Sequence, residues 1–197
     1  MSAPDSPSAT GIAPGVSLAT CRADVTELAA LHGRAAALQA IAAQQGLALP
    51  PMGRVVAGTG TLRLCVRPDR WLLLGAPEAA GTSVARWHSL CGGSAAAVDQ
   101  SSGLAALYLA GTRAREVLAR GCRLDLAVEV FPPGHAAATA MAQVSTILAA
   151  LPAGVLILTP ASTARHLREW LTATAQPFGL APPADVSFSI LSGHPES

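Results

Sequence analysis

Lysine and asparagine are absent from this chain of 197 residues, and all thirteen basic residues are arginine. Without lysine, the chain cannot carry a Walker A phosphate loop, the strand lysine of a protein kinase or a Schiff base to pyridoxal phosphate. Aromatic residues make up only 4% of the chain, and its formal net charge is +1. Few rings for base stacking and little positive charge together predict that the chain does not bind nucleic acid.

Charged residues are also scarce, at 13%, whereas hydrophobic residues reach 51% and the mean hydropathy is +0.42. A weakly charged surface predicts that part of it packs against a partner. The longest apolar run, 147–158, is too short to span a bilayer and is interrupted by Pro152 and Gly154. Residues 1–15 lack the basic and apolar segments of a signal peptide, which predicts a disordered lead and a cytoplasmic protein without membrane contact.

Residues that bind metals are present but scattered along the sequence. The four cysteines share no C-x-x-C spacing, so they are expected to be free thiols. Only one of the five histidines, His88, has a His or Cys two to four positions further on (Cys91), and one such pair is too few ligands, so no metal site is expected.

Short apolar strands alternate with helical segments along the chain. Strands are expected at 17–22, 61–66, 71–74, 95–99, 104–109 and 155–159, and helices at 31–45, 78–91, 112–121 and 162–174. Thr112 is the expected N-cap of the third helix. In the segment 136–151, alanines favour a helix and β-branched residues favour strands. Because the strands come as hairpin pairs between helices, the pattern predicts an α+β fold with mixed or antiparallel sheets.

Asp99 is the most noticeable polar residue, because it ends an apolar strand and is followed by the turn Gln100-Ser101-Ser102-Gly103. One interpretation is a carboxylate that binds a ligand or acts as a general base. The other, which we favour, is a carboxylate that accepts hydrogen bonds from the N–H groups of its own turn.

Arginines gather on one predicted hairpin at positions 63, 67 and 70. They suit an anionic ligand or an acidic partner, and a solvated hairpin face explains them equally well. The preceding Gly58-Thr59-Gly60 resembles the start of a dinucleotide-binding loop, but Arg63 stands where its third glycine is needed, so a turn is expected. Trp71 is expected to anchor the core.

Cys122 lies between Arg120 and Arg123, which is one arrangement for a reactive thiol. A catalytic thiol also needs a histidine or carboxylate to orient its base, and none is close in sequence. A buried structural cysteine is the favoured interpretation. No residue is therefore assigned a catalytic role.

Several segments, taken in order, resemble the gamma subunit family of heterotetrameric sarcosine oxidase. They are RPDRWLL (67–73), VDQS (98–101), GCRLDL (121–126) and FPPG (131–134), and the stretch from 121 to 134 is the most specific. The resemblance covers residues 16–179 and implies a fold like the folate-binding glycine-cleavage T-protein. It also implies strands in 136–151. Residues 180–197, which are rich in proline, are expected to be a flexible tail.

The resemblance implies a non-catalytic subunit that docks on and stabilises a large flavoprotein subunit. The complex would demethylate sarcosine oxidatively to glycine, with tetrahydrofolate as the acceptor of the methylene group. FAD, FMN, NAD and tetrahydrofolate would be bound by other subunits, and Asp99 is the only candidate for a cofactor contact here. The alternatives are a stand-alone folate-binding or aminomethyltransferase-like protein and a subunit of a related N-methyl amino acid dehydrogenase.

Overall fold

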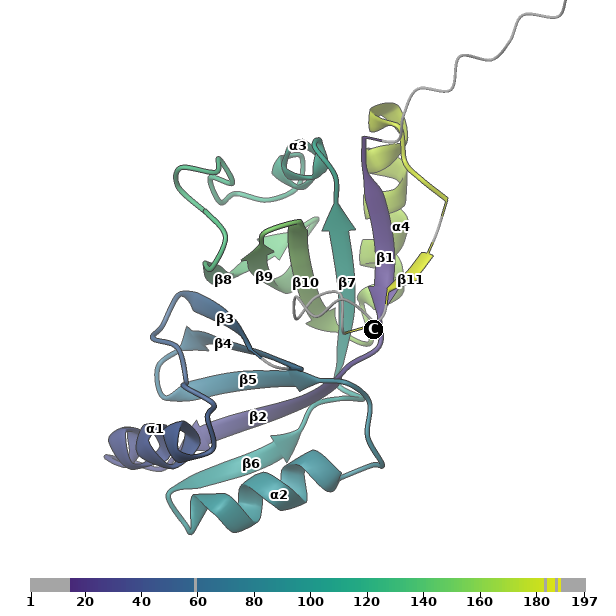
Figure 1. The fold of residues 1–197 in the computed structure, drawn as a ribbon. Helices are drawn as coiled ribbons and strands as arrows, with labels where there is room; N and C mark the ends of the chain where they lie inside the picture. The colour runs from purple at the N-terminus through teal and green to yellow at the C-terminus, as the bar shows by residue number, and fades with distance from the viewer. Residues whose placement is uncertain (1–14, 59, 183, 187, 189–197) are drawn as a thin grey trace, which may run out of the picture.

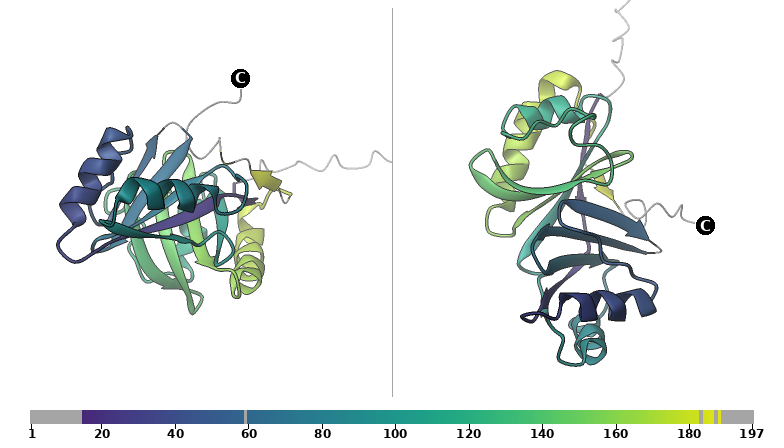
Figure 2. Two further views of the ribbon diagram at one scale, coloured as in Figure 1. Left: turned by 90° about the horizontal axis from the view of Figure 1, so that it is seen from below. Right: turned by 90° about the vertical axis from the view of Figure 1, so that its left-hand side faces the viewer.

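The computed structural model describes residues 15–58, 60–182, 184–186 and 188. These residues form two β-sheets that face each other, and a pair of helices covers the outer face of each sheet (Figure 1). The layers therefore run helix, sheet, sheet, helix, as the two turned views also show (Figure 2). This arrangement confirms the expected α+β class with sheets built from hairpin pairs.

The first sheet has five strands, all antiparallel to their neighbours, in the order β3-β4-β5-β2-β6. Its strands are β2 (Asp24–Ala30), β3 (Arg54–Gly58), β4 (Thr61–Arg67), β5 (Arg70–Gly75) and β6 (Ala95–Asp99). Its helices are α1 (Ala35–Gln44) and α2 (Thr82–Cys91). The tight turn between β4 and β5 places Asp69 at φ 57°, a left-handed conformation that Asp tolerates better than most residues.

The second sheet has six strands in the order β11-β1-β7-β10-β9-β8. Its strands are β1 (Ser17–Cys21), β7 (Leu104–Ala110), β8 (Ala136–Met141), β9 (Val144–Leu151), β10 (Gly154–Pro160) and β11 (Ala184–Val186). The helices α3 (Ala114–Ala119) and α4 (Ala164–Ala175) pack on it, and the 3₁₀ turn η1 (Gln176–Phe178) follows α4. Only β11 runs parallel to its neighbour, so this sheet is mixed.

The two sheets share one plan. In the first, β2 lies between β5 and β6; in the second, β7 lies between β10 and β1. The strand β1 therefore takes the place in the second sheet that β6 takes in the first. Since β1 continues directly into β2, the N-terminal segment belongs to both sheets and links them (Figure 1).

Three apolar clusters fill the spaces between the layers. The strand alternation sends Leu62, Leu64, Leu72 and Leu74 toward the other sheet, where they meet Leu156 and the neighbouring side chains. The outer face of the first sheet packs Trp71 and Leu73 against α1 and α2. The outer face of the second sheet packs against α3 and α4 in the same way.

Most of the expected elements are present, with different ends. The helix expected from residue 31 begins at Ala35, because β2 extends to Ala30 and Gly33 turns the chain at φ 71°. The residue that precedes α3 is Arg113, and no side chain caps the helix, so the prediction that Thr112 is its N-cap is wrong. The segment 136–151 forms β8 and β9, as the family resemblance implied. The strands β2 and β3 had not been expected.

The sequence predicts a disordered lead at residues 1–15 and a flexible tail at residues 180–197. The expected disordered lead falls almost entirely on residues 1–14, which lie outside the described residues. Within the segment 180–197, expected as a tail, β11 pairs with β1 and Phe188 is buried between the two sheets. Among the described residues, no helix is both long and apolar enough to cross a membrane.

Candidate functional site

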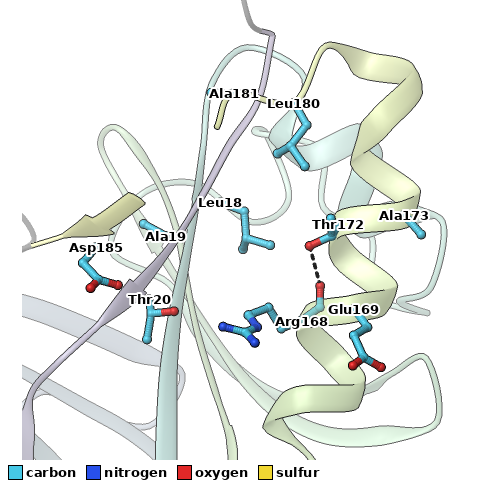
Figure 3. Close-up of a pocket in the computed structure, with 10 residues that line it drawn as sticks. All are labelled: Leu18, Ala19, Thr20, Arg168, Glu169, Thr172, Ala173, Leu180, Ala181 and Asp185. Atoms are coloured by element: carbon cyan, nitrogen blue, oxygen red, sulfur yellow. Dashed lines mark hydrogen bonds between the residues drawn. The ribbon is translucent and has the colours of Figure 1, made fainter. Parts of the chain in front are cut away.

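A groove of about 700 Å³ lies between β1 and α4. Leu18 and Thr20 reach it from β1, while Arg168 and Thr172 reach it from α4 (Figure 3). Leu180, Ala181 and Asp185, which follow η1, form its remaining wall. The groove exists because the inner side chains of α4, Leu167 and Leu171 among them, pack on the sheet and leave the helix face above β1 uncovered.

The groove combines an apolar floor with a charged rim. Leu18 and Leu180 supply the floor, and Arg168, Glu169 and Asp185 supply charges of both signs at the rim. Thr172 donates a hydrogen bond to the Arg168 carbonyl oxygen at 2.8 Å, so its hydroxyl is already engaged by its own helix (Figure 3). An apolar centre with a polar rim is typical of a surface that contacts another protein. Sequence reasoning missed this groove because β11 had not been expected.

Asp99 lies at the end of the edge strand β6, and its side chain is engaged in the turn that follows. Its Oδ1 atom accepts a hydrogen bond from the Ser101 N–H at 2.9 Å, and Ser101 Oγ in turn accepts one from the Val25 N–H. Hydrogen bonds from the Ser101 side chain and backbone lower the pKa of the Asp99 carboxyl. A carboxylate held ionised in this way stabilises the turn and is a weak proton acceptor.

Another cavity, of about 340 Å³, lies beside this turn and is lined by Ser101, Ser102 and Leu104. Asp99 is not among its lining residues. A contact between Asp99 and a cofactor remains a prediction.

The three hairpin arginines do not converge. Arg67 and Arg70 lie on the face of the sheet opposite the helices, where both approach the buried carboxylate of Glu27, at 3.6 and 2.8 Å. Gln100 donates to the same carboxylate at 3.2 Å. Arg63 instead points to the helix face and is buried, so a solvated hairpin face does not describe it. The expected turn after Gly58 is confirmed by the β3–β4 hairpin.

Replacing Glu27 by glutamine is expected to lower the free energy of unfolding by about 1 kcal/mol, because the two arginine partners are half exposed and solvent screens them. Urea denaturation followed by circular dichroism measures this change. The matched control is Glu78→Gln, which removes a single surface ion pair with Arg86 and should cost less. Equal effects of the two variants would contradict a contribution from the Glu27 network.

The four cysteines are free, and three of them are buried. Burial raises the pKa of the Cys21 thiol to about 11 and also raises the pKa of Cys65 and Cys91. Cys122 is half-buried, and its Sγ lies 3.8 Å from the Thr139 hydroxyl. Among the described residues, no group of three or more potential ligands could hold a metal ion.

Alkylation of the folded chain at pH 8 is expected to modify Cys122 first and Cys21 last. The attacking species is the thiolate, and a pKa of about 11 leaves Cys21 almost fully protonated at that pH. Timed iodoacetamide labelling with peptide mass mapping measures the order, and labelling in denaturant gives the unprotected rates. Labelling of Cys21 as fast as that of Cys122 would contradict the described burial.

Comparison with known proteins identifies relatives of the whole fold. A chain of the heterotetrameric sarcosine oxidase from Corynebacterium sp. U-96, solved in complex with pyrrole 2-carboxylate, superimposes with a TM-score of 0.75 and 27% identity, over 87% of this chain and 90% of that one. Aminomethyltransferase T of the glycine cleavage system from Bartonella henselae superimposes with a TM-score of 0.63 and 13% identity. It matches over 87% of this chain and only 48% of its own, which shows a shared fold.

No curated protein sequence matches the chain. The model of the sarcosine oxidase gamma subunit family, however, matches residues 29–174. That span begins at the end of β2 and ends in the last turn of α4, so it includes β3 to β10 and the four helices described above, whereas β1 and β11 lie outside it. The chain therefore belongs to the sarcosine oxidase gamma subunit family.

Proposed function

We propose that this chain is the non-catalytic gamma subunit of a cytoplasmic heterotetrameric sarcosine oxidase, and that it docks on and stabilises the large flavoprotein subunit. One observation carries the proposal: the chain shares its fold, over nearly the full length of both, with a chain of a heterotetrameric sarcosine oxidase. The complex would convert sarcosine to glycine and pass the methylene group to tetrahydrofolate. FAD, FMN, NAD and tetrahydrofolate would be bound by its other subunits.

The surface of the chain supports a docking role. Several large apolar side chains are exposed on loops and edge strands, among them Met52 at 64%, Val128 at 51% and Val130 at 57%. Val128 and Val130 lie in the loop between α3 and β8, beside the buried Phe131. Apolar groups gain free energy when a partner removes them from water, at about 25 cal/mol per Å². The groove between β1 and α4 offers a further surface of mixed character.

The stabilising role can be tested by producing the large flavoprotein subunit with and without this chain. We expect the large subunit to be recovered in higher soluble yield, and to unfold at a higher temperature, when this chain is present. An unrelated protein of similar size, produced in its place, is the control. A large subunit with the same yield and melting temperature in all three preparations would contradict the proposal.

The second candidate is a stand-alone folate-binding or aminomethyltransferase-like protein, which the shared fold with aminomethyltransferase T favours. This chain spans about half the length of that enzyme. Titration of the isolated chain with tetrahydrofolate separates the two candidates. Micromolar binding that is abolished by Asp99→Ala would favour the second candidate, and no binding would favour the docking subunit.

The third candidate is a subunit of a related N-methyl amino acid dehydrogenase. The assembled complex distinguishes it from an oxidase. An oxidase produces hydrogen peroxide in stoichiometric amount with the demethylated amino acid, whereas a dehydrogenase needs another electron acceptor. We expect peroxide formation with sarcosine.

A further inference from the structure

A second cavity, of about 160 Å³, lies on the helix side of the five-stranded sheet. The strands supply Asp24, Thr61 and Arg63 to its lining, and Ser83 and Arg86 come from the first half of α2. Glu78, in the segment before α2, completes the polar part of the wall. The cavity is separate from the groove between β1 and α4, which lies on the other sheet.

Arg63 is the unusual member of this lining, because only 4% of it is exposed. Its neighbours on β4, Leu62 and Leu64, face the core between the sheets, so the strand alternation directs Arg63 to the opposite side. Its Nε and Nη1 atoms are buried and have no hydrogen-bond partner among the described residues, and the same holds for Thr61 Oγ1. Buried polar groups nearly always have a partner, either protein or ordered water, so three unpartnered atoms beside one cavity mark it as a candidate ligand site.

Arg63 has no ion-pair partner among residues 15–58, 60–182, 184–186 and 188. Arginine stays protonated at neutral pH even where burial lowers its pKa, as it does here. Asp24 and Glu78 also line the cavity, but neither carboxylate is within ion-pair distance of Arg63. Asp24 Oδ2 accepts the Glu78 N–H at 2.8 Å, and Glu78 Oε2 pairs with Arg86 at 2.7 Å.

The wall therefore carries two arginines and two carboxylates, whose formal charges cancel. A dianion such as phosphate would leave an excess of negative charge in a partly desolvated space, which is costly. A small zwitterion keeps the cavity neutral and gives both signs a partner. A volume of about 160 Å³ corresponds to about five water molecules in the liquid. That volume suits a ligand with about five or six non-hydrogen atoms.

We propose that this cavity binds a small amino acid as a zwitterion, with its carboxylate on Arg63 and its ammonium group toward Asp24. Thr61 Oγ would donate a further hydrogen bond to the carboxylate. The site lies within this chain, so its existence does not depend on the docking role proposed above.

Isothermal titration of the full chain tests this site, with glycine, acetate, methylamine, leucine and inorganic phosphate as separate probes. We expect glycine to bind, acetate to bind more weakly because it lacks the ammonium group, and methylamine, leucine and phosphate not to bind. Preference for phosphate, or equal affinity for leucine and glycine, would contradict the charge and the size of the proposed site.

The Arg63→Met variant fills a similar volume without the charge, and it should weaken glycine binding at least about tenfold. Arg67→Met is the matched control, because Arg67 lies on the same strand but its side chain is exposed beside Glu27, and it should bind glycine normally. If Arg63→Met does not fold, Asp24→Asn gives an independent test, since it should weaken glycine but not acetate. Absence of glycine binding, or unchanged binding in Arg63→Met or Asp24→Asn, would overturn the proposal.

Discussion

Replacing Trp71 by alanine is expected to lower the free energy of unfolding by about 4 kcal/mol. Trp71 is 3% exposed and belongs to the cluster between the five-stranded sheet and its two helices, where it packs with Leu28, Leu38 and Trp87. Its Nε1 atom donates a hydrogen bond to the Pro50 carbonyl oxygen at 2.8 Å. The substitution therefore removes a large apolar contact and leaves a buried carbonyl without its donor.

Urea denaturation of the two proteins measures this loss. The Trp71→Phe variant is the control that keeps most of the apolar contact and removes only the indole hydrogen bond, so it should lose about 1–2 kcal/mol. An alanine variant as stable as the phenylalanine variant would show that Trp71 does not anchor this cluster.

Replacing Gly154 by alanine is expected to destabilise the second sheet by about 3 kcal/mol. Gly154 begins β10 and is paired with Ala110 on one side and Leu151 on the other. A Cβ atom added there would lie 2.5 Å from the Leu109 carbonyl oxygen and 2.9 Å from the ring of Tyr108. Because the closest atom belongs to the backbone of a central strand, a side-chain movement cannot relieve the contact.

The melting temperature of the variant measures this effect, and a fall of several degrees is expected. Ala153→Ser is the matched control, since Ala153 is exposed in the turn directly before Gly154 and should tolerate the change. An unchanged melting temperature in Gly154→Ala would contradict the close approach of β10 to β7.

Where the apolar pattern was regular, the sequence alone was sufficient to predict the elements. The runs that became β4, β5 and β10 alternate or are fully apolar, and they are bounded by turn residues. The strand β2 was missed because it carries Asp24, Thr26 and Glu27, which weaken the apolar signal. Those polar residues are satisfied by partners far along the chain, such as Ser83 and Arg70, which no local pattern contains.

For the polar residues too, a local sequence pattern predicts local contacts and misses those that depend on the folded sheet. The Asp99 turn is predicted from five consecutive residues, 99–103, and the structure shows the backbone hydrogen bond that this pattern favours. The hairpin arginines could not be separated by sequence, because a bulge between Leu64 and Arg67 changes the register of the strand. As a result, Arg63 faces the helices and Arg67 approaches Glu27 on the other face.

The family could be inferred from the sequence because each of its motifs is a short run of consecutive residues. The segment 121–134 carries the most specific motifs and lies within the span that the family model matches. The groove between β1 and α4 needs β11, which pairs with β1 from more than 160 positions away. Surfaces that depend on such distant pairings require the structure.

The proposed docking role is tested most directly by recovering a tagged form of this chain from the cells that produce it and identifying its partners by mass spectrometry. We expect a large flavoprotein chain to be recovered in one-to-one ratio, with the mass of a heterotetramer by native measurement. A chain that is recovered alone, as a folded monomer in the presence of that flavoprotein, would contradict its role as a docking subunit.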